Sequence, residues 1–161
     1  MATSRPTSIR IGVGAGTADD RIFPAVQLAR HGELDYLVFE CLAERTVARE
    51  NLTRSKNPER GYTPRMLERI EAVLPACLEN DVRIVTNMGA ANPRGGVRAI
   101  RQLALDMGVG DVSCAVVTGD DVSDLIRTMP KLKLLETGEP LCSDVGRFER
   151  TSNDCRARNV M

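Results

Sequence analysis

Apolar side chains recur along this chain with two periods, and each change of period marks an expected element. Alternating or continuous short apolar runs indicate strands at Ser8–Val13, Asp35–Phe39, Val82–Thr86 and Ser113–Thr118. The second run contains four successive apolar residues, Tyr36–Phe39, which is typical of a strand buried on both faces. The pattern therefore predicts four strands.

Between these runs the apolar positions repeat every three or four residues, as in amphipathic helices. Helices are expected from Asp19 or Asp20 to Gly32, from Leu42 to Arg54, from Thr63 to Leu78, from Val97 to Met107, and as a short helix from Gly119 to Pro130. Asp19 or Asp20 can cap the first helix, and Gly32 is expected to end it in the left-handed conformation. Thr63 followed by Pro64 is a strong helix start.

Alternating strands and helices predict an α/β fold with parallel strands. We expect an open, mainly parallel sheet of about four strands with helices on both faces, in a Rossmann-like arrangement. Residues 1–141 form this α/β domain in our interpretation. Residues 142–161 are polar and rich in Arg, without clear periodicity, and are expected to be a divergent tail.

Composition and charge exclude several classes of binding partner and cellular location. The 161 residues carry 22 basic and 22 acidic side chains, so the net charge is zero, which argues against nucleic acid or an anionic membrane surface as a partner. No apolar run is long enough to span a membrane. The five cysteines form no CxxC pair, and the first residues leave no room for a presequence. These features predict a cytoplasmic protein.

The candidate chemistry lies directly after the predicted strands. In an open parallel sheet, ligands bind outside the carboxyl ends of the strands, so side chains that follow different strands gather on one rim. All four strand ends carry glycines, carboxylates or amides. The candidates are Gly14, Gly16, Asp20 and Arg21 after the first strand, Glu40 and Glu44 after the second, Asn87, Gly89 and Asn92 after the third, and Asp120 after the fourth.

Two interpretations of the glycine cluster remain open. Gly14 and Gly16 could expose backbone amides that hold a phosphate or carboxylate, or they could only turn the chain from strand to helix. The dinucleotide fingerprint needs a third glycine at position 17, which is Thr17. The sequence therefore argues against NAD as a cofactor.

The polar candidates likewise have structural alternatives. Glu40 and Glu44 are four residues apart, a spacing that lets two carboxylates share a proton or hold a divalent cation. Glu44 could instead pair with Arg45 on the helix surface. Asn87 and Asn92 could orient a carbonyl or carboxylate, or serve only in turns. For Asp120 the alternative is a helix cap.

Several blocks of sequence together resemble a known family. They are Arg10-Ile11-Gly12-x-Gly14-x-Gly16 with Asp20-Arg21, Leu34 to Glu44, Thr86 to Pro93, and Gly119-Asp120-Asp121. They are similar to the N-terminal region of the acyclic terpene utilisation (AtuA-like) family, formerly described as a domain of unknown function. The resemblance runs from about Ile9 to Leu141. It implies a role in the breakdown of branched, acyclic terpenes such as citronellol and geraniol, next to acyl-CoA enzymes.

The combined hypothesis is lyase- or hydrolase-type chemistry on a small acid or its acyl-CoA thioester. Asn87, Gly89 and Asn92 would hold a carbonyl or carboxylate, and Glu40 would act as general base or, with Glu44, as metal ligand. Asp20 and Arg21 would position the substrate. The alternatives are a non-catalytic scaffold that associates through an exposed sheet edge, and an inactive, truncated form of a longer family member.

Overall fold

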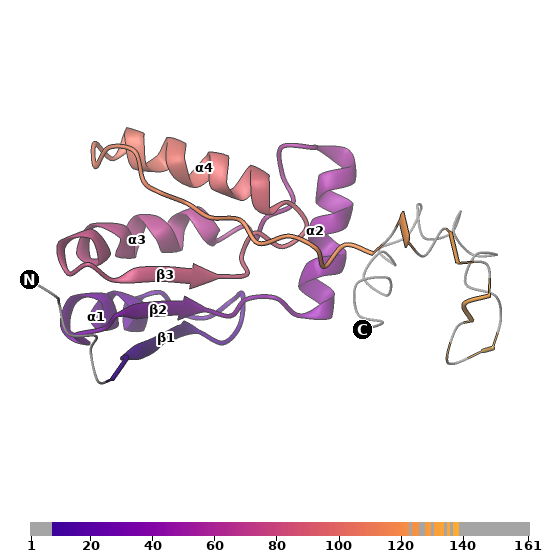
Figure 1. Cartoon of the computed structure of the whole chain (residues 1–161). Coiled ribbons are helices and arrows are strands. Elements are labelled where there is room, and N and C mark those ends of the chain that lie inside the picture. The colour runs from indigo at the N-terminus through magenta and orange to yellow at the C-terminus, as the bar shows by residue number, and fades with distance from the viewer. Residues whose placement is uncertain are drawn as a thin grey trace, which may run out of the picture.

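The fold alternates strands and helices in the order expected for an α/β protein (Figure 1). The computed structural model describes residues 8–122, 124–125, 128–129, 131–133, 135 and 137–138. The elements in chain order are β1 (Ile11–Ala15), α1 (Phe23–His31), β2 (Tyr36–Phe39), α2 (Glu44–Lys56), α3 (Met66–Glu79), β3 (Arg83–Thr86) and α4 (Pro93–Asp106). The predicted tail, residues 142–161, lies outside the described residues.

The three strands form an open, parallel sheet in the order β1-β2-β3. Ile11 is level with Tyr36, and Tyr36 is level with Arg83, so the strands start at the same height. Their carboxyl ends consequently meet at one rim. The α/β class and the parallel sheet predicted from the sequence are confirmed.

Burial shows that the described helices cover one face of this sheet. Leu37 and Phe39 of β2 are buried beneath the helices, whereas Ile11 and Val13 of β1 are 61% and 64% exposed. Successive strands lie side by side, and right-handed crossovers then place the connecting helices on the same face. Helices on both faces were expected; in the described part of the chain the second face is open.

The glycines of the first strand serve packing within the sheet. The sequence placed the strand at Ser8–Val13 and Gly14 in the turn, but β1 extends to Ala15. A Cβ on Gly14 would lie 2.6 Å from the ring of Phe39, and one on Gly12 would collide with Leu34. Gly14 is therefore needed because the buried ring of Phe39 occupies the space beside it, whereas the contact at Gly12 is with the end of the half-buried Leu34 side chain.

The structure does not confirm the predicted fourth strand. Residues 113–118 are described and mostly exposed, but they have no strand pairing, and Val117 is 92% exposed. The apolar run predicted a strand, but an apolar run does not by itself supply a partner edge. Of the short helix expected from Gly119 to Pro130, Asp124 and Leu125 are the described helical residues.

Several helix boundaries also differ from expectation. α1 begins at Phe23 without a side-chain cap, so neither Asp19 nor Asp20 caps it. α3 begins at Met66 rather than at Thr63, and α2 is shifted to Glu44–Lys56. α4 begins at Pro93, four positions before the predicted Val97, because Asn92 caps it with a side-chain oxygen that accepts from Gly95 N–H. Gly32 ends α1 with φ −79°, and the next residue, Glu33, takes the positive φ. The chain thus turns one residue later than the glycine suggested.

Candidate functional site

The side chain of Asn87 joins the ends of two neighbouring strands. Its Oδ1 accepts a hydrogen bond of 2.7 Å from the backbone N–H of Cys41, directly after β2. Its Nδ2 donates to Oε1 of Glu40 over 3.0 Å. Asn87 follows β3, so one amide side chain fixes the relative position of two strand ends. The structure therefore brings together two of the residues that the sequence selected, Glu40 and Asn87.

Glu40 is exposed but held in one orientation. Its Oε1 accepts from the Asn87 amide and, over 3.0 Å, from the backbone N–H of Leu42. Among the described residues no donor is recorded for Oε2. One carboxylate oxygen of this exposed residue is thus fixed by two donors, an arrangement suited to proton transfer by the other oxygen.

Asp20 occupies the backbone amides that follow β1. Its Oδ2 accepts from the N–H groups of Gly16 (2.7 Å) and Thr17 (3.0 Å), and its Oδ1 accepts from the Thr17 hydroxyl (3.2 Å). These donors lower the pKa of Asp20, because they stabilise the charged carboxylate. The amides that the sequence offered to a ligand's phosphate or carboxylate are therefore satisfied by the protein itself.

Arg69 of α3 and Arg65, the residue just before α3, hold the same loop through its carbonyl oxygens. The Nη2 of Arg69 donates to the carbonyl oxygens of Thr17 (3.4 Å), Ala18 (2.9 Å) and Asp20 (2.8 Å). Arg65 Nη1 donates to the carbonyl of Asp20 over 2.9 Å. Arg69 is fully buried, and its Nε and Nη1 have no partner among the described residues. The buried guanidinium of Arg69 therefore supports the β1–α1 loop at the rim.

Sequence reasoning missed Arg69, although a signal was present. Arg69 falls at helical spacing between Met66 and Val73, both fully buried residues of the same helix. A charged residue on a buried helical stripe is rare unless it is paired, and such a position points to a specific structural or functional task.

Cys41 packs against the β1–α1 loop. Its thiol lies 3.6 Å from the carbonyl oxygen of Thr17, and the residue is buried. Burial raises the pKa of the Cys41 thiol, while the nearby charge of Arg69 opposes this rise. At neutral pH the protonated thiol is favoured, so Cys41 is poorly suited to act as a nucleophile.

Asn92 and Gly89 also follow β3, but their contacts lie within the protein. Besides capping α4, Asn92 donates from Nδ2 to the carbonyls of Pro58 (2.9 Å) and Arg60 (2.8 Å). A Cβ on Gly89 would lie 2.7 Å from the Cα of Pro93, so glycine allows close approach there. Their catalytic and substrate-binding roles remain predictions.

The remaining candidates lie around or beyond this cluster. Glu44 is the first residue of α2, and Arg21 is exposed before α1. Asp120 lies after the unpaired 113–118 segment. No group of three or more His, Cys, Asp or Glu that could hold a metal occurs among the described residues. The proposed cation ligands are therefore limited to Glu40 and Glu44, and their role stays a prediction.

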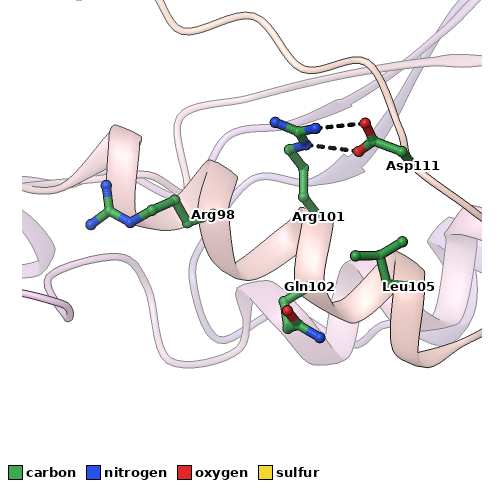
Figure 2. Close-up of a pocket in the computed structure, with 5 residues that line it drawn as sticks. All are labelled: Arg98, Arg101, Gln102, Leu105 and Asp111. Atoms are coloured by element: carbon green, nitrogen blue, oxygen red, sulfur yellow. Dashed lines mark hydrogen bonds and ion pairs between the residues drawn. The ribbon is translucent and has the colours of Figure 1, made fainter.

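A surface pocket lies on α4 and the chain just after it (Figure 2). The residues that line it are Arg98, Arg101, Gln102, Leu105 and Asp111. Arg101 makes a two-pronged ion pair with Asp111, with nitrogen–oxygen distances of 2.8 and 2.5 Å. This pair ties the chain that leaves α4 back onto the helix.

The fold and the rim together define an α/β protein with a carboxylate–amide pair at the carboxyl ends of adjacent parallel strands. Residues 9–155 match the model of the acyclic terpene utilisation family protein AtuA. The chain belongs to this family, and its family-level role is in acyclic terpene utilisation. The match extends past Leu141, the last residue of the resemblance that the sequence blocks indicated.

Comparisons with curated proteins and with solved structures found no match for the chain. Among the described residues, no helix has the length and apolar character needed to cross a membrane.

Proposed function

We propose that this protein binds a small branched acid or its acyl-CoA thioester at the rim of the sheet, and that Glu40 is the general base. The observation that carries the proposal is the hydrogen bond between Asn87 and Glu40, which orients one exposed carboxylate at the junction of two strands. Family membership supplies the chemical setting, acyclic terpene utilisation.

Glu40 has the geometry that proton abstraction requires. A base must reach the proton and keep a constant orientation, and two donors on Oε1 fix the carboxylate of this exposed residue. The hydrogens on the carbon next to a thioester carbonyl are the natural target, because the carbonyl stabilises the negative charge that develops. This step belongs to lyase-type chemistry; in hydrolysis the same carboxylate would instead take a proton from the water that attacks the thioester carbonyl.

The β1–α1 loop gives the rim a rigid boundary. Asp20 fixes the loop amides, and Arg69 fixes its carbonyls from the buried side. Arg21, exposed in the same loop, is the cation available for a substrate carboxylate or a CoA phosphate. We assign Arg21 to substrate recognition and Asp20 to the conformation of the loop that presents it.

The test is a thermal-shift series with branched short-chain acids, their CoA thioesters and divalent cations. A ligand that binds the native state must raise the melting temperature. We expect a CoA thioester to raise it, and Glu40→Gln to reduce turnover of that thioester at least about 100-fold, as general-base removal typically does.

Glu79→Gln is the matched control. Glu79 ends α3, at the opposite end of the sheet from the rim, and the substitution makes the same chemical change. Equal effects of both variants, or unchanged turnover in Glu40→Gln, would refute the assignment. A shift that appears only with a divalent cation and disappears in both Glu40→Gln and Glu44→Gln would assign Glu40 as a metal ligand.

The open sheet face favours a second candidate, a scaffold domain that associates through this face. Ile11, Val13 and Val85 present exposed apolar side chains there, at 61%, 64% and 50%. Exposed apolar patches commonly mark interaction sites. Light scattering would test it: an oligomer that Val13→Lys converts to monomer, in a protein without ligand response, would replace the enzymatic proposal.

A further inference from the structure

On the side away from β2, the edge of β3 has no neighbouring strand among the described residues. The N–H groups of Arg83 and Asn87 donate toward β2, to the carbonyls of Asp35 and Phe39. Because successive residues of a strand face opposite edges, Ile84 directs its N–H and C=O away from β2. No described strand pairs with that side.

The chain that leaves α4 is anchored on that helix and on the core. Gly108 ends α4 with φ 72°, and Val109 N–H donates to the carbonyl of Ala104. The Arg101–Asp111 ion pair then holds the next turn on the helix (Figure 2). Val112 packs against the core.

From this anchor, residues 113–118 run in the same direction as β3 (Figure 1). They cross from the end of the molecule where β3 begins toward the end where it finishes. A right-handed crossover through α4 places the following parallel strand next to β3. With β2 on its other side, β3 has one free edge, and it is the edge that faces such a strand.

Burial along this segment partly matches the alternation of a strand. Val112 and Val116 are half-buried and Ala115 and Val117 are exposed, while Cys114, which would share a face with Val112 and Val116, is exposed. With Val112 and Val116 toward the helices, Ala115 and Val117 would join Val85 on the open face of the sheet. Six residues span about 20 Å when extended, enough to reach the rim from the start of β3.

We propose that residues 113–118 dock in parallel onto the free edge of β3 and act as a strap that completes the rim. Docking would satisfy the outward backbone groups of β3 and carry Asp120 to the level of Asn87. The second consequence rests on the function proposed above, whereas the docking itself does not.

Disulfide trapping tests the docking in the full chain. Val85→Cys and Val117→Cys are combined with Cys114→Ser, Cys142→Ser and Cys155→Ser, and Ala115→Cys replaces Val117→Cys in a second variant to cover the neighbouring register. Adjacent strands are about 4.8 Å apart, within reach of a disulfide. We expect rapid intramolecular oxidation in at least one variant.

Val13→Cys replaces Val85→Cys in the matched control. Val13 lies at the same height on the same face but two strands away, about 10 Å from β3, so it should not oxidise with position 115 or 117. No crosslink to position 85, or equal crosslinking to 13 and 85, would overturn the proposal. A disulfide between two chains would also overturn it and assign the edge to a second copy.

Hydrogen exchange of the unmodified protein gives an independent readout. A docked strap exchanges its inward amides at least about 100-fold more slowly than unstructured chain. Exchange of residues 113–118 at the unstructured rate would overturn the proposal even if the variants failed to fold. Because neither measurement needs a ligand, failure of docking is distinguishable from failure of the proposed enzymatic function.

Discussion

The ring of Phe39 fills the space beside Gly14, where an added Cβ would lie 2.6 Å from the ring carbon Cε1. Phe39 is 1% exposed and belongs to the core, so the ring cannot move aside into solvent. We predict that Gly14→Ala lowers the free energy of unfolding by about 1–3 kcal/mol, the usual cost of overpacking. Urea unfolding measures it.

Gly16→Ala is the control for this effect. A Cβ at Gly16 would come no closer than 3.9 Å to another atom, the Asp20 Oδ2, and the backbone N–H that Asp20 binds is retained. We expect a change within about 0.5 kcal/mol, as for other uncrowded surface substitutions. Equal destabilisation at both positions would show that backbone conformation, rather than the Phe39 ring, demands glycine.

Gly14 also illustrates why the sequence predicted the order of strands and helices better than the contacts between them. Strand and helix order follow from apolar periodicity, which is local. The role of Gly14 depends on Phe39, a residue on another strand, and a glycine in a short run reads equally well as a turn. The same limit applies to residues 113–118, because periodicity indicates extended chain but not the edge with which it pairs.

That Glu40 and Asn87 lie together at the rim could be predicted from the topology of the sheet. Parallel strands end together, so residues after Phe39 and after Thr86 had to be neighbours, and Glu40 and Asn87 are. The hydrogen bonds of Asp20 to the amides of Gly16 and Thr17 are local but depend on the orientation of one side chain. The support of the loop by Arg69 joins residues 49 positions apart in the sequence. No spacing rule encodes such contacts.

Arg69 should contribute far more to the stability of the protein and of its β1–α1 loop than its neighbour Arg65. Arg69→Met removes three hydrogen bonds to carbonyl oxygens and leaves that of Ala18 without a recorded donor. Loss of the buried charge offsets part of this cost, since two of its nitrogens are unpartnered. We expect a net destabilisation of about 2 kcal/mol.

The comparison is Arg65→Met, expected to cost less than about 1 kcal/mol because the side chain is about one-third exposed and its partner Glu68 lies on the surface. Hydrogen exchange in residues 16–20 should accelerate in Arg69→Met and stay close to the original rate in Arg65→Met. The reverse order would contradict the role assigned to Arg69.

Asp20 should make stability depend on pH in the acidic range. Its pKa is lowered from 3.8 in the native protein by the N–H groups of Gly16 and Thr17. The carboxylate therefore stabilises the native state at pH values above 3.8, and this contribution is lost as pH falls through the native pKa. Asp20→Asn should be less stable than the original chain at pH 6, and the two should converge below pH 3.8. Melting curves that differ equally at pH 6 and pH 3 would contradict this account.

Cysteine reactivity should follow burial. Cys114 is exposed, whereas Cys41 and Cys77 are buried, and desolvation raises the pKa of Cys77 to about 11. At pH 8 about one thousandth of Cys77 is thiolate, so its alkylation is slow even before access is considered. Iodoacetamide labelling with peptide mass spectrometry should modify Cys114 first among these three. Early labelling of Cys41 would instead show an accessible thiolate and reopen a nucleophilic role for it.

Substitutions of Asn92 and Asn87 should have different effects on stability and on turnover. Asn92→Ala removes the α4 cap and two hydrogen bonds to carbonyls of the preceding loop, and we expect a loss of about 3 kcal/mol. Asn87 is half-buried, and Asn87→Ala should cost about 1 kcal/mol because Glu40 and Cys41 N–H can turn to water. If Glu40 is the general base, Asn87→Ala should nonetheless impair turnover more than Asn92→Ala, measured at a temperature where both are folded. A larger loss of turnover in Asn92→Ala would move the catalytic centre from the Glu40–Asn87 pair to the start of α4.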